Sequence, residues 1–252
     1  MLNDKRRMEI TFMKEETKRM AERFSCEYQV FEKGGDPEDL EDAYFEALKE
    51  GKDKGFYPAI LVVDEYVTEW FDGILEEDYD REKLISGCGN NGKELLEEYF
   101  RDNTEEDTEE EKREFIGNET EGDEIEHFCS YISFSANELE EDTLLLKIPV
   151  KHSWELIAWV PLGGWNDCPP PEDMIAVCKY WFEKYGAIPA VFTHDVMEFY
   201  APNKLNGADS LEAAKEHYAF CPDRVFQSTS TNTLSEVAVC LEKSEVWYFW
   251  WD

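Results

Sequence analysis

One stretch of this sequence limits the possible folds more than any other. Residues 56–63 form an unbroken apolar run, rich in β-branched side chains, and Asp64 and Glu65 follow it directly. A run of this length is typical of a β-strand that is buried on both faces. The carboxyl ends of such strands are where open α/β sheets bind ligands, so Asp64 is a candidate for a metal or substrate role. A solvated acidic loop, or a cap for a helix over residues 67–75, is the simpler interpretation.

The rest of the chain alternates between helical and strand-like patterns. We expect helices over residues 6–23, 37–49, 67–75, 93–101, 172–185, 210–220 and 233–242. We expect further strands over residues 25–31, 128–135, 144–150, 154–160, 188–192, 196–201 and 246–250. This order favours an α+β protein with a mixed β-sheet and helices packed on it, rather than a purely parallel sheet.

The charge is distributed unevenly along the chain. The formal net charge is −34, but residues 149–252 contribute only fifteen acidic and seven basic residues to it. We therefore expect an acidic α/β N-terminal lobe over residues 1–143 and a C-terminal α+β domain over residues 144–252. Residues 101–126 hold thirteen acidic and three basic residues. This segment is either a charged insertion or an acidic contact surface, with Glu106, Asp107 and Glu110 as candidate binding residues.

The charge also limits the partners. A strongly negative field repels the phosphates of nucleic acids and anionic lipid headgroups, whereas it attracts a basic protein. We expect neither a secretory signal nor a membrane span. The seven cysteines are odd in number and contain no Cys-x-x-Cys pair, so we expect reduced thiols and a cytoplasmic location. The sequence predicts no cofactor, since the glycine-rich turn at 86–92 lacks the residues of a phosphate-binding loop.

His194, Asp195 and Glu198 form the most promising polar cluster. A histidine beside carboxylates can act as a general base or a metal ligand. Neighbouring residues of a strand point to opposite faces, however, so His194 and Asp195 converge only if they lie in a turn, and Asp195 and Glu198 face opposite sides. A turn with local hydrogen bonds is the simpler interpretation. Cys168 could pair with a histidine as a nucleophile, but the four histidines are scattered and predict no metal site.

The chain ends in an aromatic run, Trp247-Tyr248-Phe249-Trp250-Trp251. Alternation places Trp247, Phe249 and Trp251 on one face of a strand and Tyr248 with Trp250 on the other. Because both faces are aromatic, we expect a central strand that is covered on both sides and serves the core before any site.

Five blocks in order carry a resemblance to a known family: residues 159–169, 181–187, 193–198, 218–223 and 247–252. Together they resemble the C-terminal domain of the bacterial family called domain of unknown function 4253, over about residues 145–252. Residues 51–64 are similar to the upstream part of its longer members, whereas the acidic middle of the chain departs from the family. The resemblance implies a fold unit and no activity. Its motif residues are candidates for a shared site or for turns and caps: Trp165, Asn166, Asp195, Glu198 and Asp223.

Two functions remain open at this point. The first is a cytoplasmic acidic protein-binding module, such as an immunity or antitoxin-like protein that neutralises a basic toxin. The alternative is a hydrolytic or metal-assisted enzyme with a site near His194 and Asp195. The two differ in one structural requirement: an enzyme needs these side chains to converge on one cleft. The sequence does not indicate an oligomeric state.

Overall fold

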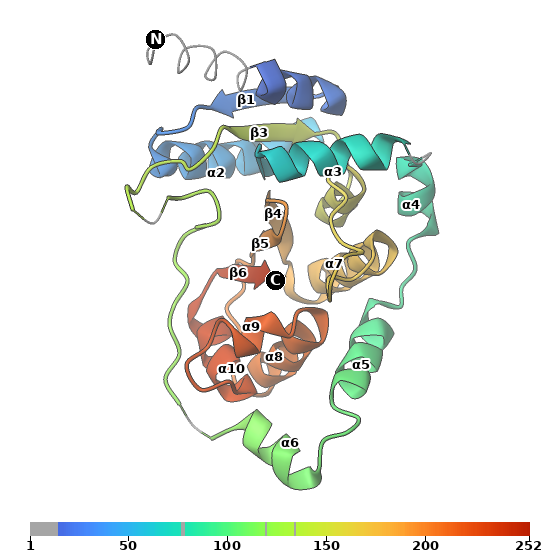
Figure 1. The fold of residues 1–252 in the computed structure, drawn as a ribbon, viewed down its shortest axis with the longest axis vertical. Coiled ribbons are helices and arrows are strands. Elements are labelled where there is room, and N and C mark those ends of the chain that lie inside the picture. Colours follow the sequence, from blue (N-terminus) through green and yellow to red (C-terminus); the bar gives the residue numbers. More distant parts are fainter. Residues whose placement is uncertain (1–14, 77–78, 119, 134) are drawn as a thin grey trace.

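The computed structural model describes residues 15–76, 79–118, 120–133 and 135–252, and shows a mixed β-sheet surrounded by helices (Figure 1). This arrangement confirms the predicted α+β class. The strands are β1 (Glu27–Phe31), β2 (Tyr57–Val62), β3 (Thr143–Ile148), β4 (Ile188–Phe192), β5 (Val196–Tyr200) and β6 (Val246–Trp250). The helices are α2 (Pro37–Lys54), α3 (Glu65–Glu76), α4 (Arg81–Gly87), α5 (Gly92–Asn103), α6 (Glu109–Ile116), α7 (Pro171–Tyr185), α8 (Ala208–Phe220), α9 (Asp223–Phe226) and α10 (Leu234–Lys243). Residues 15–24 are also helical, and η1 (Ser153–Ala158) is a 3₁₀ helix.

The six-stranded sheet has the order β1-β3-β2-β4-β5-β6. β2 and β4 run parallel, while the other neighbouring strands are antiparallel. β2 is the apolar run of the sequence, and its residues Ala59–Leu61 are at most 1% exposed, as expected for a central strand. Because β2 and β4 are adjacent and parallel, the segments that follow their carboxyl ends emerge at the same edge of the sheet.

Both halves of the chain contribute to this sheet. β1 and β2 come from residues 1–143, and β3, from the C-terminal part, pairs with both of them. β2 pairs in turn with β4. The boundary that we predict at residue 144 therefore falls inside one continuous sheet.

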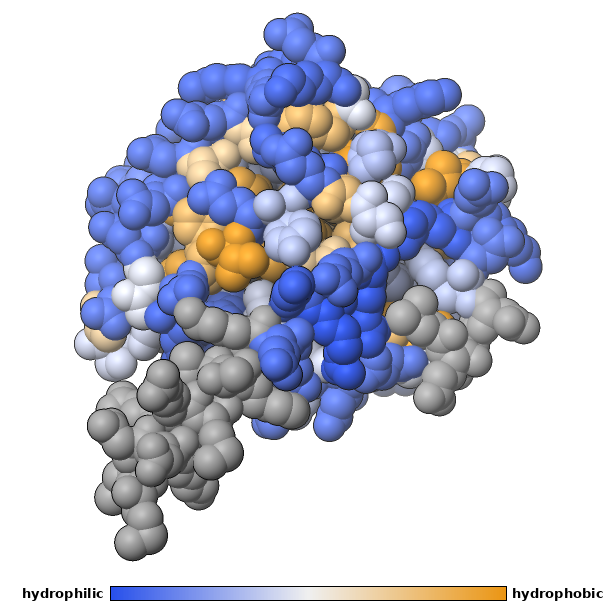
Figure 2. Space-filling model, turned by 90° about the horizontal axis from the view of Figure 1, so that it is seen from above, coloured by the Kyte–Doolittle hydropathy of each residue, from blue (hydrophilic) through white to orange (hydrophobic). Residues whose placement is uncertain are grey.

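Hydrophobic residues cover both faces of the sheet. On one face, α7, α8 and η1 pack over an aromatic cluster that includes Trp181, Phe199 and Trp247. On the other, α2 packs against the sheet together with Phe128 and Tyr131. The face shown in Figure 2 is largely hydrophilic, with apolar residues visible between hydrophilic ones.

The acidic segment 101–126 lies along the outside of α8 and α10 before the chain returns to the sheet (Figure 1). Hydrogen bonds to α10 and to the residue after it hold the later part of this segment. The Ser235 hydroxyl donates to the Ile116 carbonyl at 2.6 Å, Lys243 Nζ donates to the Gly122 carbonyl at 2.6 Å, and the Ile125 N–H donates to Ser244 Oγ at 2.8 Å. The acidic segment is thus attached to α10, the last helix of the chain.

Two of the predicted elements are wrong, and one predicted helix is longer than expected. Residues 154–160 contain η1 instead of a strand, since a short buried helical turn can show the same alternation as a strand. The strand predicted over residues 128–135 is not formed by its described residues: 130–131 lie in a turn, and Ile132 makes one isolated bridge with Leu139. The helix predicted over residues 37–49 is α2, which continues to Lys54 and stops where Gly55 adopts a φ of 79°.

The closing aromatic strand also differs from the prediction. Within the described residues, β6 pairs only with β5 and is the edge strand of the sheet, not a central one. Trp247 and Phe249 are buried on one face, as expected, but Tyr248 and Trp250 on the other face are only half-buried. This second face contributes to the wall of a cavity.

Candidate functional site

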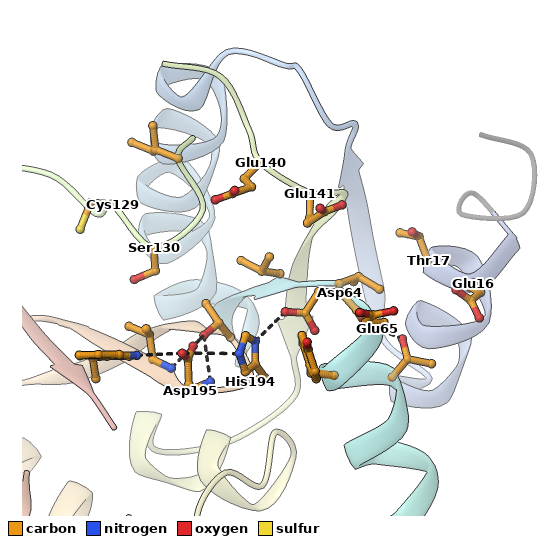
Figure 3. A pocket seen from close by; sticks show the side chains of 18 of the residues that line it. Glu16, Thr17, Asp64, Glu65, Cys129, Ser130, Glu140, Glu141, His194 and Asp195 are labelled. Carbon is orange, nitrogen blue, oxygen red and sulfur yellow. Dashed lines mark hydrogen bonds and ion pairs between the residues drawn. The ribbon is translucent and has the colours of Figure 1, made fainter. Parts of the chain in front are cut away.

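A histidine and a carboxylate meet at the carboxyl ends of the two parallel strands (Figure 3). Asp64 follows β2 and His194 follows β4, so the topology brings together two residues that are 130 positions apart. His194 Nδ1 lies 2.7 Å from Asp64 Oδ2. The side chain of His194 is 38% exposed and that of Asp64 is 18% exposed, so the pair lies partly below the surface.

Asp64 has two roles at once. Its Oδ1 accepts the Val67 N–H at 2.6 Å and thereby caps the first turn of α3, while its Oδ2 contacts His194. The two interpretations of Asp64 from sequence, helix cap and site residue, are therefore compatible. The cap fixes the carboxylate at the orientation that the histidine requires.

Asp195 contacts the other side of the histidine. His194 and Asp195 lie in the turn between β4 and β5, where strand alternation does not separate them, and His194 Nε2 is 3.5 Å from Asp195 Oδ2. The Trp250 indole N–H donates to the same Asp195 oxygen at 2.8 Å, and the Thr193 hydroxyl donates to Oδ1 at 2.9 Å. Asp195 is thus held by β6 and by its own turn.

These carboxylates favour the protonated imidazole. The hydrogen bond with Asp64 is the main cause that raises the pKa of His194 above its ordinary value, and the charges of Asp195 and Asp64 act in the same direction. Partial burial opposes them. His194 is therefore an imidazolium between two carboxylates over a wider pH range than an isolated histidine, and it can donate a proton.

The Asp64–His194–Asp195 cluster lies at a cavity of about 680 Å³. Residues 129–132 and 140–141 form one wall, and Glu16 and Thr17 of the N-terminal helix contribute to another (Figure 3). Six carboxylates line this cavity: Glu16, Asp64, Glu65, Glu140, Glu141 and Asp195. Among the described residues that line it there is no lysine or arginine. The cavity is therefore suited to a cationic ligand.

An aromatic groove of about 520 Å³ adjoins the cavity. The two share Tyr66, His194, Asp195 and Trp250. The groove is further lined by Glu69, Trp70, Trp165, Trp251 and Asp252. Tyr66 is 57% exposed, and its ring lies 4.8 Å from that of His194. We refer to these residues as the aromatic groove.

Glu198 lies behind the cavity wall. It is fully buried, and its carboxylate accepts the backbone N–H groups of Cys129 and Ser130 at 3.1 Å each. Burial raises the pKa of Glu198 above its ordinary value, and these hydrogen bonds only partly oppose the rise. Glu198 therefore positions residues 129–130 of the cavity wall. It does not belong to the cluster around His194, which follows the end of β4.

The structure places the remaining candidate residues in three locations. Cys168 is 4% exposed and does not line the cavity; burial raises the pKa of its thiol, so the nucleophilic thiolate is disfavoured. Trp165 lines the aromatic groove. Asn166 and Asp223 both bond the backbone of Asp252, the first through its side-chain amide and the second by accepting the Asp252 N–H at 3.3 Å.

The acidic candidates of the middle segment lie elsewhere. Glu106 and Glu110 are exposed and Asp107 is half-buried, between α5 and α6 or at the start of α6. None of the three lines the cavity or the groove as described. The chain therefore presents two separate acidic surfaces, one concave and one on the outer segment.

Two further properties bear on the class of protein. Within the described parts of the chain, no group of three or more His, Cys, Asp or Glu side chains is arranged to hold a metal ion. Over the same residues, no helix has both the length and the apolar character needed to cross a membrane.

Comparison with known proteins agrees with the resemblance seen in the sequence. Residues 144–252 match the family described as Domain of unknown function (DUF4253), and the C-terminal part of the chain is a domain of this family. The match begins at β3 and includes His194, Asp195 and Trp250, whereas Asp64 lies outside it. A search of curated proteins and a search of solved structures each returned no match.

Proposed function

We propose that this chain, with its DUF4253 domain, is an acidic protein-binding module that captures a basic protein partner at the carboxylate-lined cavity. The observation that carries this proposal is the cavity wall, in which six carboxylates surround one histidine and no described lysine or arginine is present. An immunity or antitoxin-like protein that neutralises a basic toxin is one form of such a module.

The charge of the whole chain supports the same function. A net charge of −34 attracts a basic protein over several ångströms and accelerates the encounter. The cavity then offers a concave place where a cation loses its water among fixed carboxylates, which strengthens the attraction. Glu65 and Glu140 are exposed at this cavity, so they are available to a partner without rearrangement.

Two double variants with the same change of charge test the location. Glu65→Gln/Glu140→Gln neutralises the cavity, and Glu106→Gln/Glu110→Gln neutralises the outer segment. Binding of an oligolysine peptide, and of basic proteins encoded next to this gene, is measured by calorimetry at low and at high salt. We expect the cavity variant to lose about tenfold in affinity and the control variant about twofold or less.

Each other result has a defined meaning. A larger loss in the control variant would place the binding surface on the outer segment and refute the cavity. Equal losses would show that only the overall field attracts the peptide. Weak binding that does not change with salt would refute the acidic module itself, because an interaction between charges must weaken as salt screens it.

A second candidate function is a hydrolase that uses acid–base chemistry at His194. The observation that favours it is the Asp64–His194 contact of 2.7 Å, since a carboxylate that orients Nδ1 leaves Nε2 on the side of Asp195 and the cavity. Within the described residues, no hydroxyl or thiol bonds His194, and burial raises the pKa of the Cys129 thiol that lines the cavity. The nucleophile would therefore be water, with His194 exchanging its proton.

Hydrolysis of p-nitrophenyl acetate, an uncharged ester that the acidic cavity does not repel, tests this second function. We expect His194→Asn to reduce the rate by about a hundredfold, the usual contribution of a positioned acid or base. His152→Asn, at an exposed histidine away from the cavity, is the matched control and is expected to keep the rate. Equal rates for the wild-type protein and His194→Asn would exclude His194 as the acid–base residue.

A further inference from the structure

The aromatic groove combines several tryptophan side chains with carboxylates. Aromatic side chains form its walls, and three carboxylates, Glu69, Asp195 and Asp252, lie among them. The faces of aromatic rings carry partial negative charge and attract cations. Ring faces and carboxylates therefore act together here, and among the described lining residues no basic side chain other than His194 offsets them.

Hydrogen bonds fix two of the indole rings that line the groove. The Trp250 N–H is bonded to Asp195 Oδ2 at 2.8 Å, and the Trp70 N–H is bonded to the Pro161 carbonyl at 2.8 Å. Both indoles are held by their polar edges, so their orientation is set before a ligand arrives. A preorganised site loses less conformational entropy on binding than a flexible one.

We propose that the aromatic groove binds an arginine side chain of the basic protein partner, which rests on the proposed function. A guanidinium is planar, stacks on an indole and can form paired hydrogen bonds with a carboxylate, whereas an ammonium does none of these in the same plane. The carboxylate of Asp195 lies beside the Trp250 ring because the two side chains are hydrogen-bonded. One guanidinium can therefore reach an indole face and a carboxylate together.

The chain already contains a pair of this kind. The guanidinium of Arg81 lies 3.6 Å from the centre of the Trp159 ring, in direct stacking contact. Arg81 Nε also donates to the Ala158 carbonyl at 3.3 Å, so stacking and hydrogen bonding occur together. This pair shows the geometry that we expect for the partner's arginine in the groove.

An uncharged apolar ligand fits the groove less well. It would cover carboxylates without giving them a counter-charge, and removing a charged group from water costs several kcal/mol unless it is paired. A cation gains from both the rings and the carboxylates. The position of the groove beside the cavity further allows one basic segment to occupy both, with other positive residues near Glu65 and Glu140.

Matched peptides test the proposal with the full chain. Three short peptides differ at a single central position, which holds arginine, lysine or citrulline, the uncharged analogue of arginine with the same shape. A fourth probe is N-acetylarginine amide, which has the side chain without the polypeptide. Affinities are measured by calorimetry at low salt, and quenching of tryptophan fluorescence reports on contact with the rings.

The variants separate the groove from a general charge effect. Trp165→Ala removes one wall of the groove, and Trp159→Ala removes a half-buried tryptophan outside it as the matched control. Asp252→Asn removes the negative charge of a carboxylate at the exposed rim of the groove. It replaces Trp165→Ala as the test variant if that protein does not fold. Thermal unfolding of each variant checks the fold.

We expect the arginine peptide to bind about tenfold more tightly than the citrulline peptide and more tightly than the lysine peptide. Trp165→Ala and Asp252→Asn should each reduce this advantage at least about threefold, and Trp159→Ala should not. N-acetylarginine amide should bind far more weakly than the peptide. Equally tight binding of this amide would show a small-molecule site and overturn the proposal.

The failure of this inference differs from the failure of the proposed function. If basic peptides bind in a salt-dependent manner but Trp165→Ala has no effect, the groove is refuted and the acidic module stands. If arginine and lysine peptides bind equally, the guanidinium preference is refuted. If no basic peptide binds at low salt, both the function and the inference are refuted.

Discussion

His217 should make the protein sensitive to acid. Its ring is fully buried between aromatic side chains, with ring centres 4.6 Å from Trp247 and 4.7 Å from Phe249. Neither ring nitrogen has a hydrogen-bond partner among the described residues. Burial, and then the nearby charge of Arg224, lowers the pKa of His217 well below its usual value of 6.5. The folded state therefore keeps this histidine neutral.

The direction and size of the effect follow from proton linkage. Below pH 6.5, His217 binds a proton in the unfolded chain but stays neutral in the folded chain. The free energy of unfolding therefore falls as the pH falls. The loss approaches about 1.36 kcal/mol for each pH unit below 6.5, as long as the folded chain keeps His217 neutral. This is a substantial part of a typical stability of about 5–15 kcal/mol.

Urea unfolding followed by tryptophan fluorescence measures this dependence at several pH values. His217→Phe removes the titrating group and fills the aromatic site, and His217→Leu is a second variant in case phenylalanine packs poorly. His152→Phe makes the same change at an exposed histidine and is the control. We expect the acid slope of the two His217 variants to be about 1.36 kcal/mol per pH unit smaller than that of wild type and control.

The comparison of slopes removes contributions that are common to all four proteins. The raised pKa of Glu198 acts in the opposite direction. As the pH falls toward 4.5, Glu198 is protonated in the folded chain at a higher pH than in the unfolded chain, and this stabilises the fold. The raised pKa of His194 adds stability that is fully present below pH 6.5 and is lost at higher pH. Equal acid slopes in wild type and both His217 variants would refute the assignment to His217.

Three further predictions concern the site and the core. Asp64→Asn keeps an acceptor for the α3 cap but removes the charge beside His194, so the pKa of His194 should fall; an unchanged NMR titration would contradict this. Gly92→Ala places a Cβ 2.3 Å from the Ala176 carbonyl oxygen between α5 and α7, and should lower the stability to urea by about 1–3 kcal/mol. Trp247→Ala should cost about 3–5 kcal/mol in the same assay, and a loss below about 1 kcal/mol would show that its site is not tightly packed.

Local signals in the sequence predict much of the fold. The apolar run at 56–63 identifies β2 because no other residue pattern of that length is so uniformly apolar and β-branched. Gly186 ends α7 with a φ of 73°, as expected for a left-handed helix terminus. The β4–β5 hairpin follows from two apolar runs separated by three residues. These features depend on neighbours in the sequence, which a pattern can describe.

The features that the sequence did not predict depend on long-range pairing. Alternation correctly assigns Trp247 and Phe249 to one face, but only the sheet order shows that β6 is an edge strand with its other face at a cavity. The same holds for η1, where a fully buried segment gives alternation without being a strand. Tyr66 was not a candidate because a single exposed aromatic after a strand has no local signature.

In the candidate site, the fold brings together two residues, Asp64 and His194, that the sequence presents separately. Asp64 and His194 each follow an apolar strand, and the sequence presents each as a separate candidate site residue, with a cap or a turn as the simpler interpretation. Within the described residues, β2 and β4 are the neighbouring strands that run parallel, so their carboxyl ends lie side by side at the same edge of the sheet. Any sheet order that separated β2 from β4 would have separated the carboxylate from the imidazole, with no change in the local sequence.

The same topology gives the acidic N-terminal part a direct role in the site. Asp64 and Tyr66 precede the DUF4253 match, yet they contact His194 inside it. Residues 129–132 and 140–141 also precede it and wall the cavity, held in part by Glu198. The DUF4253 domain thus supplies His194, Asp195 and three of the groove's tryptophans, Trp165, Trp250 and Trp251, while most of the carboxylates of the cavity come from the acidic part of the chain. Attraction of a cation to this cavity therefore depends on both parts, and the variants Glu65→Gln/Glu140→Gln and Trp165→Ala probe one part each.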